Sequence, residues 1–337
     1  MMYSLADKLS KGGFKVLVAA DKPLGRADSF DFFSVNVPRF LRSETKRLLL
    51  RLRRFNPHMT ICDSWKSVAA VPHSSGRLIV LAHGQEYLEP SNSKKAAIQK
   101  LLERADLIVA SSEMTANLVK KLTPDKQIEV IFPTYMLDVA NPKQTYAKRD
   151  GITQILSLCR IEERKGLFQS AEALNELCQE GFEFHWQVAG SGPDLPRLQE
   201  YVANKPIAKH TTFLGRVTEP QKEQLLRNAS LFLMPSYQAG KSLEGFGISY
   251  TEAAKWGVPS IAGNVGGAPE AVLDGQTGWC IDGSNPQAIA EALREALSDH
   301  QKLVARGCEA KARFNIELAG DVTFARLLRL SQLDVSS

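Results

Sequence analysis

The sequence lacks the features that mark membrane-spanning and exported chains. No apolar run approaches the roughly 18 to 20 residues that cross a bilayer. The first residues contain only the short apolar run VLVAA and no cleavage signal, which argues against export. We therefore expect a cytoplasmic protein, and one that could bind peripherally to the inner face of the membrane for the reason given below.

Cysteine and histidine are few and scattered. The five cysteines are Cys62, Cys159, Cys178, Cys280 and Cys308, and none forms a C-x-x-C pair. We expect reduced thiols rather than disulfides. The six histidines include no H-E-x-x-H motif, and no two aspartates stand two residues apart, so a D-x-D motif is absent. The sequence therefore predicts neither a zinc site nor a D-x-D metal site.

The charge is divided unequally along the chain. Its 337 residues are 44% hydrophobic and 23% charged, ordinary values that exclude disordered and fibrous classes. Residues 1–150 carry a net charge of +9 and residues 151–337 a net charge of −4. Both the length and the two opposite signs indicate about two domains.

Much of the positive charge lies in RFLRSETKRLLLRLRRF, residues 39–55. A basic amphipathic helix of this kind can lie on anionic lipid, where each cation adds about 1 kcal/mol. The alternative is a solvated helix whose leucines face the core. No aromatic platform or recognition motif accompanies the charge, which disfavours nucleic acid. The candidate membrane-contact residues are Arg42, Lys46, Arg47, Arg51, Arg53 and Arg54.

Strand-like runs alternate with amphipathic stretches along the whole chain, which is the pattern of parallel sheets flanked by helices. The sequence therefore predicts an α/β fold with two Rossmann-like, doubly wound domains. We expect domains at residues 1–145 and 146–315, a polar junction at 138–151, and a terminal helix from about Ile316 to Leu333 that packs back on the first domain. The expected strands are FKVLVAAD, HMTIC, RLIVLAH, DLIVAS, IEVIF, ITQILSLCR, FHWQVAG, TTFLG, LFLMPS, PSIAG and GWCI.

Glycine-rich loops follow several strands of the second half. They are AGSGPD, EGFG and GNVGGAPE. Glycine lets the backbone approach a ligand closely, and a helix N-terminus offers unpaired N–H groups to an anion. None of the loops is a G-x-G-x-x-G turn after the first strand or a Walker loop, which disfavours dinucleotide oxidoreductases and P-loop enzymes.

The stretch SLEGFGISYTE places Glu244 and Glu252 on either side of a tight turn. We expect a helix from about Ile248 to Trp256, whose N-terminus would hold a diphosphate while the two carboxylates accept hydrogen bonds from a sugar and a ribose. This arrangement would suit a nucleotide sugar. Two alternatives remain: Ser249 to Glu252 fits a capping box, and Glu244 could be a solvated loop acid.

The stretch EGFGISYTEAAKWGVPSIAGNVGGAPEAVLDGQTGW resembles the donor-site signature of the retaining GT-B glycosyltransferases of family 4. That signature is E-x7-E with G-F-G inside and a later G-G-x-P-E. LSLCRIEERKGL is similar to the arginine and lysine loop of the family, VAGSGPDLPRL to its glycine turn, and FLGRVTEPQKEQLLRNASLFLMPS to the segment before the acidic motif. The agreement in order and spacing covers about 130 residues.

The resemblance implies two domains facing across a cleft and a set of site residues. Arg160 and Lys165 would hold the diphosphate, although surface salt bridges are the alternative. His83 would lie in the cleft beside the sugar, but a histidine at a strand end is often only packed or capping. The predicted catalytic residues are Glu244, His83, Arg160 and Lys165. The predicted donor-binding residues are Arg160, Lys165, Glu244, Gly245, Phe246, Gly247 and Glu252.

Two departures from the family pattern concern the first domain. Family members usually begin with a strand and a Gly-Gly loop before the first helix, whereas this chain begins inside that helix, at MMYSLADKLSKGGF. Thr134 and Tyr135 also stand where an Asn-Gly pair is usual. In DLIVASSEMTANLV, Ser111 and Ser112 precede a helix, and capping it is their expected task.

The resemblance predicts a retaining transferase that moves a sugar from a nucleotide-diphosphate donor to a hydroxyl, without a metal or cofactor. The expected acceptor is a saccharide or lipid-linked saccharide of cell-envelope polysaccharide or lipopolysaccharide synthesis. A catalytically degenerate nucleotide-sugar-binding or scaffold protein is one alternative. A sugar-nucleotide epimerase on the same fold is the other.

Overall fold

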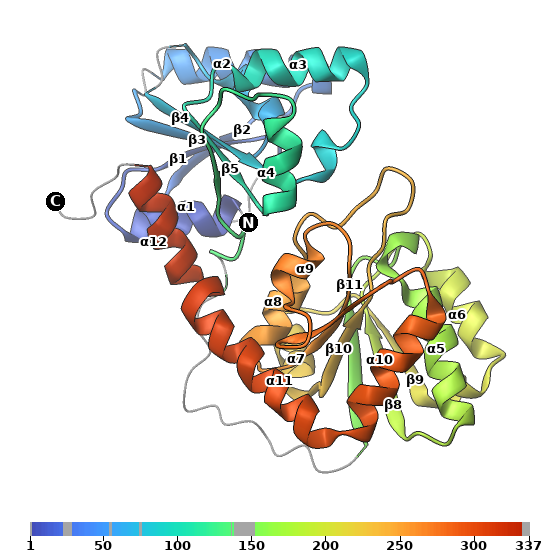
Figure 1. Cartoon of the computed structure of the whole chain (residues 1–337). Helices are drawn as coiled ribbons and strands as arrows, with labels where there is room; N and C mark the ends of the chain where they lie inside the picture. Colours follow the sequence, from blue (N-terminus) through green and yellow to red (C-terminus); the bar gives the residue numbers. More distant parts are fainter. Residues whose placement is uncertain are drawn as a thin grey trace. The chain divides into compact units, whose positions relative to one another are not determined.

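The computed structural model describes residues 2–22, 29–53, 56–73, 76–135, 137 and 152–331. The chain forms two compact units (Figure 1). Unit 1 comprises Met1–Met136 and Gly320–Ser337, and unit 2 comprises Leu137–Ala319. The expected junction at 138–151, and with it the boundary at residue 145, lies outside the described residues.

Unit 2 is built on one six-stranded sheet in the order β12-β11-β10-β7-β8-β9. All of its neighbouring strands are parallel. Every strand expected in the second half of the sequence is present. The strands are β7 (Thr153–Leu158), β8 (Phe184–Ala189), β9 (Thr211–Gly215), β10 (Leu231–Met234), β11 (Ser260–Gly263) and β12 (Gly278–Ile281).

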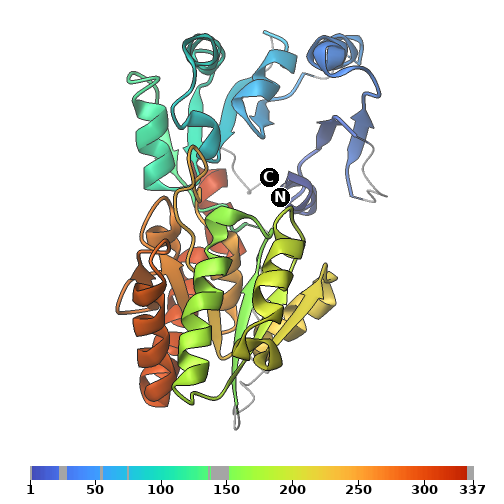
Figure 2. The same cartoon turned by 90° about the vertical axis from the view of Figure 1, so that its right-hand side faces the viewer.

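Helices lie on both faces of this sheet (Figure 2). The α-helices are α5 (Leu167–Gln179), α6 (Leu195–Ala203), α7 (Glu219–Asn228), α8 (Ile248–Lys255), α9 (Ala268–Ala271), α10 (Pro286–Ser298) and α11 (His300–Arg313). The 3-10 helices are η4 (Glu163–Lys165) and η5 (Pro206–His210). Between these layers the core is aliphatic around the fully buried Trp186, whose indole N–H donates to the hydroxyl of Ser157 at 2.9 Å.

The strand order fixes where unit 2 can bind a ligand. From β7 the chain proceeds outward to β8 and β9, and then returns to place β10 on the other side of β7. The carboxyl ends of β7 and β10 therefore flank a topological switch point. In open α/β sheets, ligands bind in the crevice beyond the carboxyl ends of the strands at such a point.

Unit 1 contains two separate parallel sheets, β1-β2 and β3-β4-β5-β6. The strands are β1 (Leu17–Ala20), β2 (Asp31–Ser34), β3 (Met59–Cys62), β4 (Arg77–Ala82), β5 (Leu107–Ala110) and β6 (Ile128–Val130). The helices are α1 (Met2–Lys11), η1 (Arg39–Leu41), α2 (Arg42–Leu52), η2 (Trp65–Ala70), η3 (Gln85–Tyr87), α3 (Asn92–Leu102), α4 (Glu113–Lys120) and α12 (Gly320–Leu330). All five strands expected in this half are present, whereas β2 was not expected.

The terminal helix belongs to unit 1. Leu327 and Leu328 of α12 share a buried cluster with Leu5 of α1 and Ile79 of β4. The helix begins at Gly320, which is later than the expected start at Ile316. A π-helical turn, η6 (Phe314–Leu318), follows α11, and the extended backbone of the next residue separates this turn from α12.

Residues 2–22 contain α1 followed by β1. Ser112 caps α4 as expected, because its hydroxyl accepts a hydrogen bond from the N–H of Thr115 at 3.1 Å.

Candidate functional site

The loops after β7 and β10 touch each other at the switch point of unit 2. The carbonyl of Arg164, in the loop after β7, accepts a hydrogen bond from the N–H of Tyr237 at 2.9 Å. Gly166 follows with a φ of +70°, and a Cβ at this position would lie 2.2 Å from the carbonyl oxygen of Pro235. Only glycine suits both the left-handed backbone and the close approach.

Glu244, in the loop after β10, is held by two cations from the loop after β7. Its Oε2 accepts a hydrogen bond from Nη1 of Arg164 at 2.9 Å and pairs with the ammonium of Lys165. The Nε of Arg164 lies 2.8 Å from a carboxylate oxygen of Glu162. The side chains of Lys165, Glu244 and Arg164 are only 9%, 13% and 14% exposed. Burial of these charges is tolerated because they neutralise one another.

The electrostatics of this cluster keep Glu244 ionised. Burial raises the pKa of the carboxyl, but the charges of Lys165 and Arg164 outweigh it and hold that pKa below its ordinary value. The carboxylate is therefore an acceptor of hydrogen bonds and not a general acid. Its Oε1 has no hydrogen-bond partner among the described residues. Nearby, burial raises the pKa of the Cys159 thiol to about 12, so this thiol is not a nucleophile.

The turn between the two glutamates packs against the glycine loop that follows β11. The N–H of Gly267 donates to the carbonyl of Glu244 at 2.9 Å, and a Cβ at Gly267 would lie 2.1 Å from the carbonyl oxygen of Gly245. Phe246 is buried and anchors the turn. Gly247, with a φ of +92°, is the N-cap of α8, so the unpaired N–H groups of that helix follow directly after the turn.

Glu252 lies in α8 and is paired with a neighbouring helix. Its Oε1 accepts a hydrogen bond from Nζ of Lys222, in α7, at 2.6 Å, and its side chain is 14% exposed. The capping-box interpretation is wrong, because the N-cap of α8 is Gly247 and no side chain caps this helix end. The helix itself, Ile248–Lys255, agrees with the expected one to within a residue.

Arg160 is placed differently from Lys165. Its side chain is 71% exposed and its Nε lies 3.5 Å from Glu162. Arg164, which the sequence analysis passed over, takes the place beside Glu244. Lys222 was passed over as well. The sequence does contain a signal for Arg164, because it stands directly before Lys165. Two consecutive cations in a buried loop each need an acid as a partner, which would have predicted an ion pair for Arg164 as well.

His83 follows β4 in unit 1. Its Nε2 lies 2.9 Å from the carbonyl oxygen of Asp63, and its backbone N–H donates to the carboxylate of Glu86 at 3.0 Å. Gly84, with a φ of +110°, turns the chain immediately afterwards. The other predicted site residues belong to unit 2, so the contacts described for His83 are those within unit 1.

The basic helix α2 has an unusual apolar surface. None of its residues is buried, and Leu48 and Leu52 are 57% and 68% exposed. Phe40, just before the helix, is 81% exposed. Leu49 and Leu50 are half-buried. The alternative of a solvated helix whose leucines face the core therefore fits these two leucines but not Leu48 and Leu52. Within the described residues, no helix has both the length and the apolar character needed to cross a bilayer.

The cations of this segment are partly engaged. Arg42 lies 3.4 Å from a carboxylate oxygen of Asp21, and Lys46 pairs with the same carboxylate. Arg47 pairs with Glu44, and the guanidinium of Arg53 lies 4.7 Å from the centre of the Phe33 ring. Arg51 is exposed. Arg54 lies outside the described residues.

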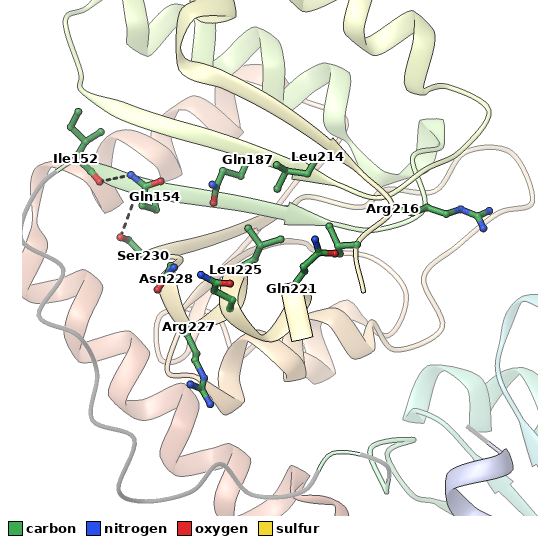
Figure 3. A pocket seen from close by; sticks show the side chains of 12 residues that line it. Ile152, Gln154, Gln187, Leu214, Arg216, Gln221, Leu225, Arg227, Asn228 and Ser230 are labelled. Atoms are coloured by element: carbon green, nitrogen blue, oxygen red, sulfur yellow. Dashed lines mark hydrogen bonds between the residues drawn. The ribbon is translucent and has the colours of Figure 1, made fainter. Parts of the chain in front are cut away.

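Unit 2 also contains a cavity of about 640 Å³ that includes none of the predicted site residues (Figure 3). It lies between α7 and the strands β7, β8 and β9. Five of its twelve lining residues carry amide side chains, and none of the twelve is acidic. The lining residues are Ile152, Gln154, Gln187, Leu214, Arg216, Val217, Gln221, Gln224, Leu225, Arg227, Asn228 and Ser230.

Several relatives of this chain are named as mannosyltransferases or glycosyltransferases. A GDP-mannose-dependent alpha-(1-6)-phosphatidylinositol monomannoside mannosyltransferase of Mycolicibacterium smegmatis is 30% identical over 242 residues, which cover 68% of this chain and 63% of the relative. A Mycobacterium tuberculosis protein of the same description is 27% identical, covering 82% and 77%. The putative colanic acid biosynthesis glycosyltransferase WcaL of Escherichia coli is 26% identical, covering 65% and 54%.

Solved structures share the fold at low sequence identity. Sucrose-phosphate synthase from Thermosynechococcus elongatus superposes with a TM-score of 0.77 at 17% identity, covering 97% of this chain and 91% of that one. Anabaena Alr3699/HepE, solved in complex with UDP and glucose, gives a TM-score of 0.77 at 16% identity, covering 98% and 94%.

Two family models divide the chain between them. The model described as Glycosyltransferase Family 4 matches residues 1–135. The model described as Glycosyl transferases group 1 matches residues 139–313, which include every predicted donor-site residue. The chain therefore belongs to the glycosyl transferases group 1 family and has the GT-B fold.

Proposed function

We propose that the protein transfers a sugar from a nucleotide-diphosphate donor to a hydroxyl acceptor with retention of the anomeric configuration. The observation that carries this proposal is the state of Glu244 at the switch point. This carboxylate is ionised, two cations bind one of its oxygens, and the helix α8 begins four residues later. An acceptor of sugar hydroxyls thus lies beside unpaired backbone N–H groups that suit a diphosphate.

The proposed roles follow from the charge that develops during transfer. Negative charge accumulates on the leaving diphosphate, so preorganised donors there make the main contribution. In this proposal Lys165, Arg160 and the N-terminus of α8 supply those donors. Glu244 orients the transferred sugar, and Glu252 accepts hydrogen bonds from the ribose hydroxyls. Gly245, Phe246 and Gly247 present their backbone to the sugar and phosphate.

We extend the proposal to His83 as a group that contacts the transferred sugar. The carbonyl of Asp63 and the carboxylate of Glu86 fix its ring and backbone. A donor of the hexose class suits the names of the relatives, which include GDP-mannose-dependent enzymes, and the neighbour solved with UDP and glucose. We propose a saccharide or lipid-linked saccharide acceptor of the cell envelope, and a reaction that needs no metal.

The test combines a donor screen with the Glu244→Ala variant. UDP-, GDP- and ADP-sugars would first be ranked by the rise in thermal stability that they cause, since a ligand of the native state stabilises it. The selected donor would then be assayed for transfer, with product NMR to establish the anomeric configuration and excess EDTA to test metal independence. We expect Glu244→Ala to lower turnover about tenfold to a hundredfold.

One control variant and two further outcomes decide between this function and its rivals. The exposed Glu309→Ala variant should keep full activity, and a loss below twofold in Glu244→Ala would remove Glu244 from the site. Nucleotide binding without any transfer or hydrolysis would favour the degenerate binding or scaffold protein. Formation of the epimeric donor in the absence of an acceptor would favour the epimerase.

We also propose that unit 1 binds the surface of an anionic membrane through η1 and α2. Phe40, Leu48 and Leu52 expose apolar side chains beside the cations of the same segment, including Arg47 and Arg51. Apolar side chains can enter the headgroup region while the cations bind lipid phosphates. This surface would keep the enzyme close to a lipid-linked acceptor.

Sedimentation with vesicles tests the membrane surface. The protein should bind vesicles that contain phosphatidylglycerol at low salt, and binding should decline at high salt and with neutral lipid. Leu48→Ser with Leu52→Ser, or Arg47→Gln with Arg51→Gln, should weaken binding severalfold. The matched control replaces Lys95 and Lys100 of α3 by glutamine. Equal losses of vesicle binding in all three variants would indicate only nonspecific attraction between the protein's charge and the lipid. That result would contradict a membrane-binding surface at α2.

A further inference from the structure

The two glutamates of the candidate site share an arrangement that the family motif does not describe. Each carboxylate is bound through one oxygen by a cation from a neighbouring element. For Glu244 this oxygen is Oε2, and for Glu252 it is Oε1. The second oxygen of each carboxylate makes no hydrogen bond with the described residues. Each acid therefore combines a fixed orientation with one oxygen that can accept from a ligand hydroxyl.

Arg164 is suited to fix Glu244 because it is itself fixed from two sides. Its Nη1 donates to Glu244 at 2.9 Å, and its Nε lies 2.8 Å from Glu162. Its carbonyl accepts from the N–H of Tyr237, which joins the loop after β7 to the loop that carries Glu244. The planar guanidinium can bind two acids at once, which an ammonium on a flexible stem does less well.

The charges around Glu244 give Arg164 a task separate from that of Lys165. Glu162, Arg164, Lys165 and Glu244 together carry no net charge. When Lys165 turns toward a diphosphate, Arg164 still neutralises Glu244 and prevents its carboxylate from repelling the ligand. Without Arg164, the same lysine would have to serve both anions.

Lys222 has the corresponding position beside Glu252. Its Nζ lies 2.6 Å from Glu252 and 2.7 Å from Glu219, which belongs to its own helix. Burial lowers the pKa of Lys222, but hydrogen bonds to these two carboxylates outweigh burial and raise it, so the cation persists at neutral pH. The pair connects α7 to α8 and fixes the rotamer of Glu252.

We propose that Arg164 and Lys222 are positioning residues, which hold Glu244 for the transferred sugar and Glu252 for the nucleoside. This inference rests on the proposed function, because it assigns the two carboxylates to two parts of one donor. It predicts that the two cations affect different steps, although both belong to the same unit and are similarly buried.

The experiment measures nucleotide binding and catalysis separately for Arg164→Gln and Lys222→Gln in the full chain. Calorimetry gives the Kd of the nucleoside diphosphate alone, and steady-state assays give kcat, KM and their pH dependence with the whole donor. We expect Arg164→Gln to lower kcat about tenfold to a hundredfold with less than a threefold change in that Kd. We expect Lys222→Gln to raise that Kd about tenfold, with a smaller effect on kcat.

Two readouts separate positioning from simple destabilisation. Loss of Arg164 should move the acidic limb of the kcat/KM profile to higher pH, because Glu244 then loses one of its cations. Lys222→Arg should restore most of the nucleotide affinity, whereas Arg164→Lys should restore kcat only in part. The control variants Arg197→Gln and Lys302→Gln remove cations of exposed pairs and should leave all parameters unchanged.

Several outcomes would overturn the inference. Arg164→Gln and Lys222→Gln could lower kcat and affinity by the same factor, which would show that the two cations do not act on different steps. Either variant could also match its control, which would leave the cation without a role. These results differ from failure of the proposed function, in which the wild-type protein itself would transfer no sugar from any donor while the nucleotide Kd values remained measurable.

Discussion

Glu244 couples the stability of unit 2 to pH. Its pKa in the folded protein lies below the ordinary value of 4.5, so its ion pairs stabilise the native state above about pH 4.5. This stabilisation should decline as the pH falls from 4.5 through the folded pKa. The free energy of unfolding of the wild type, measured with urea, should therefore fall more between pH 7 and pH 3 than that of Glu244→Gln.

The exposed variant Glu309→Gln serves as the control for this pH series, because many other carboxylates also titrate in that range. It should follow the wild-type curve in parallel. A Glu244→Gln curve that runs parallel to the wild type as well would mean that Arg164 and Lys165 do not stabilise the carboxylate.

Gly267 should be intolerant of even a methyl group. Its φ of −89° suits any residue, so the restriction is purely steric: a Cβ would lie 2.1 Å from the carbonyl oxygen of Gly245. We expect Gly267→Ala to reduce the free energy of unfolding by about 1–3 kcal/mol and to weaken nucleotide binding, as measured by urea titration and calorimetry.

Gly13→Ala is the matched comparison for Gly267→Ala. Gly13 has a φ of +89° but open space around its Cβ position. Alanine there should therefore reduce the free energy of unfolding only through the left-handed backbone, by about 1 kcal/mol. It should leave nucleotide binding unchanged. Normal binding by Gly267→Ala would show that the turn between the glutamates can shift without harm.

At the scale of elements, the capping box of α7 should control Lys222. The hydroxyl of Thr218 accepts from the N–H of Gln221, whose side chain accepts from the N–H of Thr218 in return. Thr218→Ala should cost about 0.5–2 kcal/mol and raise the nucleotide Kd, because the first turn of α7 carries Lys222. Chemical unfolding and calorimetry measure both effects.

Ser91→Ala is the control for this element. Ser91 occupies the same position before α3, but its side chain makes no capping hydrogen bond. Its replacement should change stability by less than half of the Thr218→Ala effect and leave nucleotide binding unaltered. Equal effects of the two substitutions would contradict a special role for the capping box.

Much of the fold followed from hydrophobic pattern alone, and the exceptions have physical reasons. The expected strands formed because their apolar runs are buried in parallel sheets. The four residues of β2 begin with an aspartate and end with a serine, and only Phe33 among them is buried, so the run carried little signal. The terminal helix began late because tertiary packing of η6 and the extended Ala319 interrupt a sequence that is otherwise helical.

The candidate site was predictable to the extent that it depends on contiguous motifs. Glu244, the glycine turn and Lys165 were all found in this way, and the structure brings Lys165 and Glu244 into contact. Arg164 and Lys222 were missed because their partners are 80 and 30 residues away along the chain. Only the folded loops and helices bring such pairs together. The roles assigned to the site remain predictions.

At the scale of the whole molecule, the effects of nucleotide should be confined to unit 2. A nucleoside diphosphate at 100 times its Kd stabilises the state that binds it by about 2.7 kcal/mol. Hydrogen exchange should therefore slow in the loops at residues 159–166, 235–247 and 264–267, while the strands β3 to β6 of unit 1 keep their rates. Mass spectrometry of peptic peptides would show this pattern.

The alternative location within unit 2 is the cavity lined by amide side chains (Figure 3). Protection centred on α7 and the strands β8 and β9, without slower exchange at the three loops, would move the nucleotide to that cavity. Such a result would contradict the proposed site and leave the family assignment intact.

The division of strands in unit 1 has a consequence for how the protein behaves at high concentration. Among its described residues, unit 1 has two sheets and therefore four sheet edges, whereas a single continuous sheet would have only two. Backbone N–H and C=O groups along an exposed edge can form hydrogen bonds with an extended segment of another molecule. Unit 1 is therefore the part of the molecule from which we expect intermolecular strand pairing, and with it aggregation, to start.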